Sequence, residues 1–184
     1  MKVMHMDIRD YLLAALANAH FYTSSAMEGL TEEAAHWQPP GTTSTIARLL
    51  AHAVLVEDLM LNRIIKGGEP IFLAGGWVAR TGLPEAAAGR LRDVEAIWYQ
   101  EWRLQLDAFN SYRLAVERSA SDYIASVDLE SLEREITVGP TTRSLDGALR
   151  GVVIHHLLIH NGEISAVKGL QGLAGPPATA VWVR

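Results

Sequence analysis

The chain has 184 residues, of which 49% are hydrophobic and 20% charged, a composition that fits one globular domain. Its formal net charge is -5 and its 16 Lys and Arg residues are dispersed, which argues against a nucleic-acid partner. No apolar run approaches the roughly 18 residues of a membrane span, and Met1–His5 does not open a signal peptide, so we expect no membrane role.

The first part of the chain predicts two amphipathic helices. Apolar residues at helical spacing mark the first helix from about Ile8 to Gly29. Pro39-Pro40 then interrupts helical structure, and Thr43 or Ser44 can cap a second helix. Gly67-Gly68 ends that helix and opens a glycine-rich connection over residues 67–89.

The second part predicts two more helices. An apolar stripe runs through residues 91–126, and because one helix of that length would overhang its neighbours, we expect a break near Asp107–Asn110. An extended connection over residues 133–142 leads to a fourth helix with Ser144 as its N-cap. A C-terminal tail of residues 173–184 follows, in which Ala178–Arg184 is expected to be strand-like.

Four amphipathic helices with few strand signals predict an all-α protein. We expect one domain over residues 1–184, a four-helix bundle with a long insertion between the second and third helices. The chain contains no cysteine, which excludes disulfides, thiolate ligands and a cysteine nucleophile. Any bound metal must therefore use nitrogen or oxygen ligands, and the lack of cysteine fits the cytoplasmic location that we expect.

Three histidines lie in two of the predicted helices: His52 in the second, and His156 and His160 in the fourth. Residues four apart on a helix differ by about 40° in direction and roughly 6 Å in height, so His156 and His160 can converge on one ion. Bundle metal sites are built from facing helices, and His52 can supply a third ligand. Three imidazoles suit Zn²⁺ or Ni²⁺ and leave a position for water or substrate.

A structural role for these histidines is the alternative. Imidazoles on an apolar helix face are costly to bury without partners, and these rings could hydrogen-bond to one another or to Glu163. His20 is interpreted as structural, and His155 as a residue that supports a ligand or an interface, because it points about 100° away from His156.

Other metal and catalytic motifs are missing or misplaced. A di-iron bundle needs two Glu-x-x-His motifs, whereas this chain has one, Glu33–His36, beside the proline turn. The sequence has neither His-Glu-x-x-His nor Gly-x-Ser-x-Gly, which disfavours a zincin and a serine hydrolase.

A longer pattern connects the helices: Trp37-Gln38-Pro39-Pro40, then Ser44-Thr45-Ile46-Ala47-Arg48-Leu49-Leu50-Ala51-His52, then Ser144-Leu145, His156, His160, Gly162 and Ile164. From about Met6 to Gly172 the chain resembles the DinB/YfiT-like superfamily of metal-binding four-helix bundles. That superfamily typically continues His-x-x-x-His with Arg-Gly-Gln-Ile. Here the segment reads Asn161-Gly162-Glu163-Ile164, so Asn161 and Glu163 depart from the pattern.

The resemblance implies that His52, His156 and His160 are metal ligands. Superfamily members include S-transferases and isomerases that use thiols such as mycothiol or bacillithiol. We therefore expect a divalent-metal-dependent enzyme, a low-molecular-weight-thiol S-transferase or a hydrolase, in which a metal-bound water or thiol reacts with a small-molecule substrate. The alternative is a non-catalytic bundle that binds a small ligand or a metal for sensing, storage or stress response.

Two expectations concern surfaces. Residues 67–89 directly follow the helix of His52, so we expect Phe72 and Trp77 to help cover the metal and control access to it.

Five tryptophans, the long third stripe and the apolar residues Val181–Val183 offer more apolar surface than four helices bury. We therefore expect a homodimer.

Overall fold

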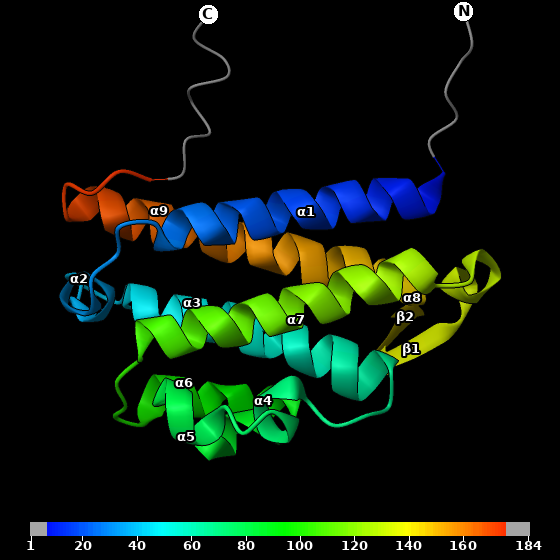
Figure 1. The fold of residues 1–184 in the computed structure, drawn as a ribbon, viewed down its shortest axis with the longest axis horizontal. Coiled ribbons are helices and arrows are strands. Elements are labelled where there is room, and N and C mark those ends of the chain that lie inside the picture. The colour runs from blue at the N-terminus through cyan, green and yellow to red at the C-terminus, as the bar shows by residue number, and fades with distance from the viewer. Residues whose placement is uncertain (1–6, 176–184) are drawn as a thin grey trace, which may run out of the picture.

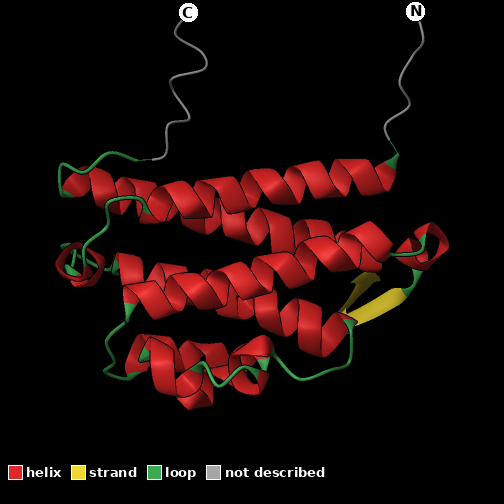
Figure 2. Cartoon of the chain, in the orientation of Figure 1, coloured by secondary structure: helices red, strands yellow, loops and turns green. Residues whose placement is uncertain are grey.

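The computed structural model describes residues 7–175, in which four long helical segments pack side by side (Figure 1). The segments are α1 (Ile8–Met27), α3 (Ile46–Asp58) continued by η1 (Leu59–Ile65), α7 (Leu106–Ser126), and α8 (Leu145–Ala148) continued by η5 (Leu149–His155) and α9 (His156–Leu170). α1 contacts α7 and α9, and α3 contacts the same two helices. The expected all-α bundle is confirmed, and Figure 2 shows how little of the described chain is strand.

Side-chain oxygens cap the N-termini of three of the four long helical segments, those that start with α1, α3 and α8. Asp7 accepts a hydrogen bond from the backbone N–H of Asp10, and Ser144 accepts one from Gly147, the N-cap predicted for the fourth helix. Thr45 is the N-cap of α3, and its side chain accepts a hydrogen bond from the backbone N–H of Arg48. The cap therefore lies one or two residues beyond the predicted Thr43 or Ser44, whose hydroxyls remain available for other contacts.

α3 is buried on nearly every face. Eleven of its 13 residues are buried, and its apolar side chains share one core with Leu12 of α1 and Phe109 of α7. Helix α3 and its continuation also carry the half-buried His52 and the buried polar side chains of Glu57, Asp58 and Asn62. Buried polar groups require hydrogen-bond partners, so these four side chains constrain how the neighbouring elements are placed.

The insertion between the second and third long helices folds into short helices. They are α4 (Ile71–Ala74), α5 (Val78–Thr81), η2 (Glu85–Ala88), η3 (Leu91–Glu95) and α6 (Ala96–Tyr99). These elements lie on the side of α3 and α7 that faces away from α1 and α9 (Figure 1).

Asp58 anchors the insertion to α3. Its carboxylate accepts hydrogen bonds from the backbone N–H groups of Ile71 and Phe72, at 2.9 and 2.8 Å. The Tyr112 hydroxyl of α7 and the Asn62 side chain donate to the same carboxylate, each at 2.8 Å. One fully buried acid thus joins the start of α4, the central helix and α7.

The third predicted block breaks earlier than expected. Residues 100–105 are non-helical, whereas we expected the break near Asp107–Asn110. In this stretch the N–H of Leu104 donates to His36 Nε2 at 3.0 Å, and the N–H of Gln105 donates to the Thr81 carbonyl at 2.9 Å. These contacts with distant residues replace helical hydrogen bonds. The apolar stripe is therefore not one overhanging surface, and the homodimer stays a prediction.

Three smaller elements complete the described chain. α2 (Glu32–His36) and η4 (Leu129–Glu133) are single turns, and the predicted extended connection is an antiparallel hairpin of β1 (Glu135–Val138) and β2 (Thr141–Ser144). Gly139 turns the hairpin with φ +58°, a left-handed conformation that suits glycine. The strand-like structure expected for Ala178–Arg184 lies outside the described residues.

Among the described helices, none is both long and apolar enough to cross a bilayer.

We expect Asp58→Ala to lower the free energy of unfolding by about 3 kcal/mol or more, because two buried N–H groups and a buried hydroxyl lose their acceptor. Tyr112→Phe removes one donor and keeps the carboxylate, so its expected loss is about 1 kcal/mol. Urea unfolding followed by circular dichroism measures both values. Equal losses in the two variants would contradict the anchoring role of Asp58.

Candidate metal centre

His52 of α3 and two histidines of α9, His156 and His160, meet between the two helices. Nε2 of His156 lies 3.0 Å from Nε2 of His52 and 3.1 Å from Nε2 of His160. One ring nitrogen from each residue lies within 4.8 Å of the other two. Nitrogens about 2.1 Å from a tetrahedral ion are about 3.4 Å apart, so the three rings are close to the spacing of a Zn²⁺ site.

A π-helical segment precedes the histidine pair. η5 ends at His155, and regular α-helical spacing begins at His156, so His156 and His160 lie about one turn apart on one face. A π-helical turn accommodates an additional residue and changes the direction of the side chains that follow it. His155, immediately before the pair, is exposed, and it is not part of the three-histidine group.

Burial lowers the pKa of two of these imidazoles, His52 and His156. It lowers the pKa of His52 to about 4, with a further contribution from the nearby charge of His160. Burial and the charges of His160 and His52 lower the pKa of His156 to about 3. Near neutral pH both rings are therefore unprotonated bases with a lone pair available to a metal ion.

The Nδ1 atoms of the three rings differ in their partners. Nδ1 of His160 lies 2.6 Å from Oε2 of Glu163, whereas Nδ1 of His52 and of His156 is buried without a hydrogen-bond partner. A proton on Nδ1 of His160 leaves its Nε2 free to act as a ligand. Three converging imidazole nitrogens are a donor set that fits Zn²⁺ or Ni²⁺.

A pocket of about 440 Å³ opens beside His160. Trp98 and Leu49 supply its apolar wall, and the ring of Trp98 also lies 5.3 Å, centroid to centroid, from that of His52. The remaining lining side chains are mostly polar: Thr42, Thr43, Ser44, Glu163 and Ala166. Among these described lining residues there is one carboxylate and no lysine or arginine.

The sequence identified His160 and Glu163 but not the other residues of this pocket. Trp98 belongs to the apolar stripe of residues 91–126, 46 positions away from His52 in the chain. Thr43 and Ser44 were interpreted as caps. Only the packing of α6 against α3 brings Trp98 to the histidines.

The expected lid over the histidines is wrong for Phe72 and Trp77. Both rings pack on Tyr112 of α7, at centroid distances of 5.4 and 5.9 Å. No described residue of 67–89 lines the pocket beside His160. Asp58 holds the start of α4 against α3 and α7, which directs these aromatic side chains to a different face of the bundle.

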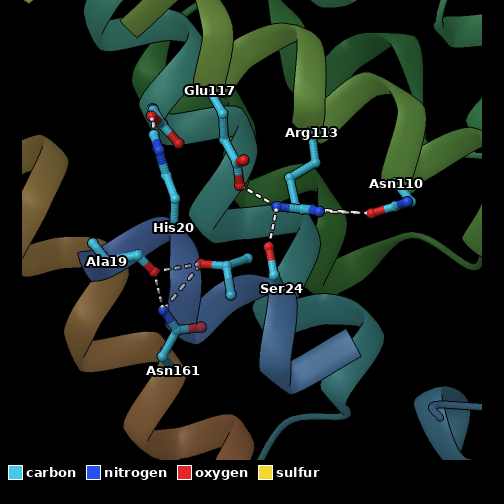
Figure 3. A network of polar contacts seen from close by, with 9 residues as sticks. Ala19, His20, Ser24, Asn110, Arg113, Glu117 and Asn161 are labelled. Atoms are coloured by element: carbon cyan, nitrogen blue, oxygen red, sulfur yellow. Dashed lines mark hydrogen bonds and ion pairs between the residues drawn. The ribbon is translucent and has the colours of Figure 1, made fainter. Parts of the chain in front are cut away.

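His20 belongs to a separate buried polar network (Figure 3). Its Nε2 lies 2.8 Å from Oε1 of Glu57, and nearby Arg113 of α7 donates to Ser24 of α1 and to Glu117. Burial lowers the pKa of His20, but the hydrogen bond to Glu57 and the charges of Glu57 and Glu117 outweigh it, so the net pKa is raised. The interpretation of His20 as structural is consistent with this environment.

Comparison with known proteins identifies the family. A sequence model of the DinB superfamily matches residues 15–164, a range that includes all three histidines. The chain belongs to the DinB superfamily. Among proteins of curated function there is no match. The crystal structure of a conserved Enterococcus faecalis protein is similar, with a TM-score of 0.70 and 16% identity over 90% of this chain and 98% of that one, which shows the shared fold.

This DinB chain departs from the pattern of the resemblance at Asn161 and Glu163. Both side chains have hydrogen-bond partners. The Asn161 side chain donates to Thr23 Oγ1 at 3.0 Å and to the Ala19 carbonyl at 3.3 Å, and thereby joins α9 to α1 (Figure 3). Glu163 contacts His160 instead. The first departure therefore stabilises the bundle, and the second lies at the candidate metal centre.

We expect His20→Gln to lower the free energy of unfolding more at about pH 6 than at about pH 9. The pKa of His20 is raised above 6.5 in the folded state, so its stabilising contribution is complete below pH 6.5 and is lost as the pH rises through the folded-state pKa. Urea unfolding of the two proteins at both pH values measures the difference, with His155→Gln as an exposed control. A loss that is the same at both pH values would contradict this assignment.

Proposed function

We propose that this chain is a divalent-metal-dependent enzyme that acts on a small molecule, with His52, His156 and His160 as metal ligands and a low-molecular-weight thiol as cosubstrate. The observation that carries this proposal is the convergence of three imidazole Nε2 atoms beside an open pocket. Zn²⁺ or Ni²⁺ is the ion that we propose, because imidazole suits both.

The chemistry follows from the ligands and from the composition of the chain. A divalent cation held by three imidazoles acts as a Lewis acid and stabilises a thiolate or an alkoxide. Because the chain has no cysteine, the thiol must come from a small molecule. In a transfer reaction the thiol sulfur bonds to an electrophilic carbon, the leaving group departs with the bonding electrons, and the thiol proton passes to solvent. In hydrolysis water replaces the thiol.

The pocket supplies the contacts that would hold the substrate. Trp98 and Leu49 offer an apolar surface for its carbon skeleton, and the hydroxyls of Thr42, Thr43 and Ser44 can hydrogen-bond to its polar groups. Trp98 contacts both the pocket and His52, so a substrate against its ring lies near the metal ligands. On this proposal we place the chain in the cytoplasm, where small thiols are kept reduced.

The proposed ligands predict how metal content changes on mutation. Wild-type protein incubated with Zn²⁺ or Ni²⁺ and then desalted is expected to retain about one ion per chain, and the double variant His156→Ala/His160→Ala close to none. Elemental analysis measures the content. His155→Ala, which removes an exposed neighbouring imidazole, is the matched control and is expected to bind like the wild type. Equal metal content in the wild type and the double variant would exclude these residues as ligands.

Catalysis is tested separately from metal binding. We expect metal-dependent consumption of bacillithiol, mycothiol or glutathione in the presence of a panel of electrophiles. For the substrate that reacts, Trp98→Ala should raise KM roughly tenfold, equivalent to about 1.4 kcal/mol of lost contact energy, with the metal still bound. If metal-loaded protein turned over no substrate of a broad panel, the non-catalytic metal- or ligand-binding function would replace the enzymatic one.

A further inference from the structure

Glu163 distinguishes His160 from the other two histidines of the candidate metal centre. It lies three residues after His160 on α9, and its Oε2 is 2.6 Å from Nδ1 of that ring. Nδ1 of His52 and of His156 is buried without any partner. Of the three rings, His160 is therefore the one whose orientation is set by a carboxylate.

The contact determines which nitrogen of His160 faces the other histidines. A carboxylate accepts hydrogen bonds, so this contact favours a proton on Nδ1 of His160, and a ring protonated there binds a metal through the lone pair of its Nε2. That Nε2 is the atom 3.1 Å from His156 Nε2. A carboxylate bound to the far nitrogen of a metal-ligating histidine fixes the ring and increases its basicity as a ligand.

This pair differs from an ordinary surface ion pair. The side chain of His160 is only 14% exposed and Glu163 is 50% exposed, so the acid contacts a ring that is largely inside the protein. By comparison, the Asp146–Arg150 pair on the same helical segment is 23% and 44% exposed and lies away from the histidines. Glu163 and His160 both line the 440 Å³ pocket, so the acid supports the ligand that faces the substrate.

We propose that Glu163 is a positioning residue of the candidate metal centre, where it holds the Nε2 of His160 toward His52 and His156 and so raises the affinity for a divalent ion. The inference rests on the proposed function, because it assumes that the three histidines bind metal. Glu163 acts through His160 and is not itself a ligand.

The test compares Zn²⁺ affinity in four proteins: wild type, Glu163→Ala, Glu163→Gln and Asp146→Ala. Competition with a chromophoric chelator measures the Kd. Glu163→Ala is expected to raise the Kd about 10- to 100-fold, and Glu163→Gln by less, because its amide oxygen can still accept the Nδ1 proton. Asp146→Ala also removes a carboxylate from an ion pair, but one distant from the histidines, and is expected to leave the Kd unchanged.

A spectroscopic measurement separates positioning from general stabilisation. The visible absorption bands of bound Co²⁺ depend on ligand orientation, so they should shift in Glu163→Ala and return toward the wild-type positions in Glu163→Gln. Thermal unfolding without metal checks that all variants fold. If Glu163→Ala has the wild-type Kd and Co²⁺ spectrum, or weakens binding only as much as Asp146→Ala, the inference is overturned while the histidine ligands stand. If wild-type protein binds neither ion, the proposed metal site and this inference both fall.

Discussion

The burial of α3 is the constraint on which the rest of this structure depends. Apolar side chains cover most of that helix, yet it and its continuation carry His52, Glu57, Asp58 and Asn62. Inside a protein an unpaired polar group costs about 1–3 kcal/mol, so each of these side chains needs a partner from a neighbouring element. His52, Glu57 and Asp58 point in different directions around the helix, and for that reason they connect α3 to different parts of the fold.

Two of these connections show how one helix organises both the core and the site. Glu57 faces His20 of α1, and a buried hydrogen bond joins the two side chains. His52 faces α9, where the groups closest to its Nε2 belong to other imidazoles whose Nε2 atoms also face inward. A buried acid beside His20 raises the pKa of that ring, whereas burial, with a contribution from the charge of His160, lowers the pKa of His52. The same residue type is thus structural on one side of the bundle and suited to a metal on the other.

The insertion between α3 and α7 supplies an aromatic side chain to the site, and Asp58 fixes the position of the insertion. Its carboxylate holds the beginning of α4, which places Phe72 and Trp77 on Tyr112 and leaves α6 to pack against α3. Trp98 of α6 therefore becomes the aromatic wall beside His52. The Enterococcus faecalis structure shares the fold of this chain at 16% identity.

Helical periodicity and capping residues determined the long helices of this protein, the fold class and the three histidines that come together, because these features depend on residues close in sequence or on a repeated apolar face. Ser144 as an N-cap and the spacing of His156 and His160 are examples. The tertiary structure alone decided where the third block breaks and which aromatic residue reaches His52. Those outcomes depend on hydrogen bonds and packing between residues far apart in the chain, such as Leu104 with His36 and Asp58 with Phe72, and local sequence patterns carry no record of such pairs.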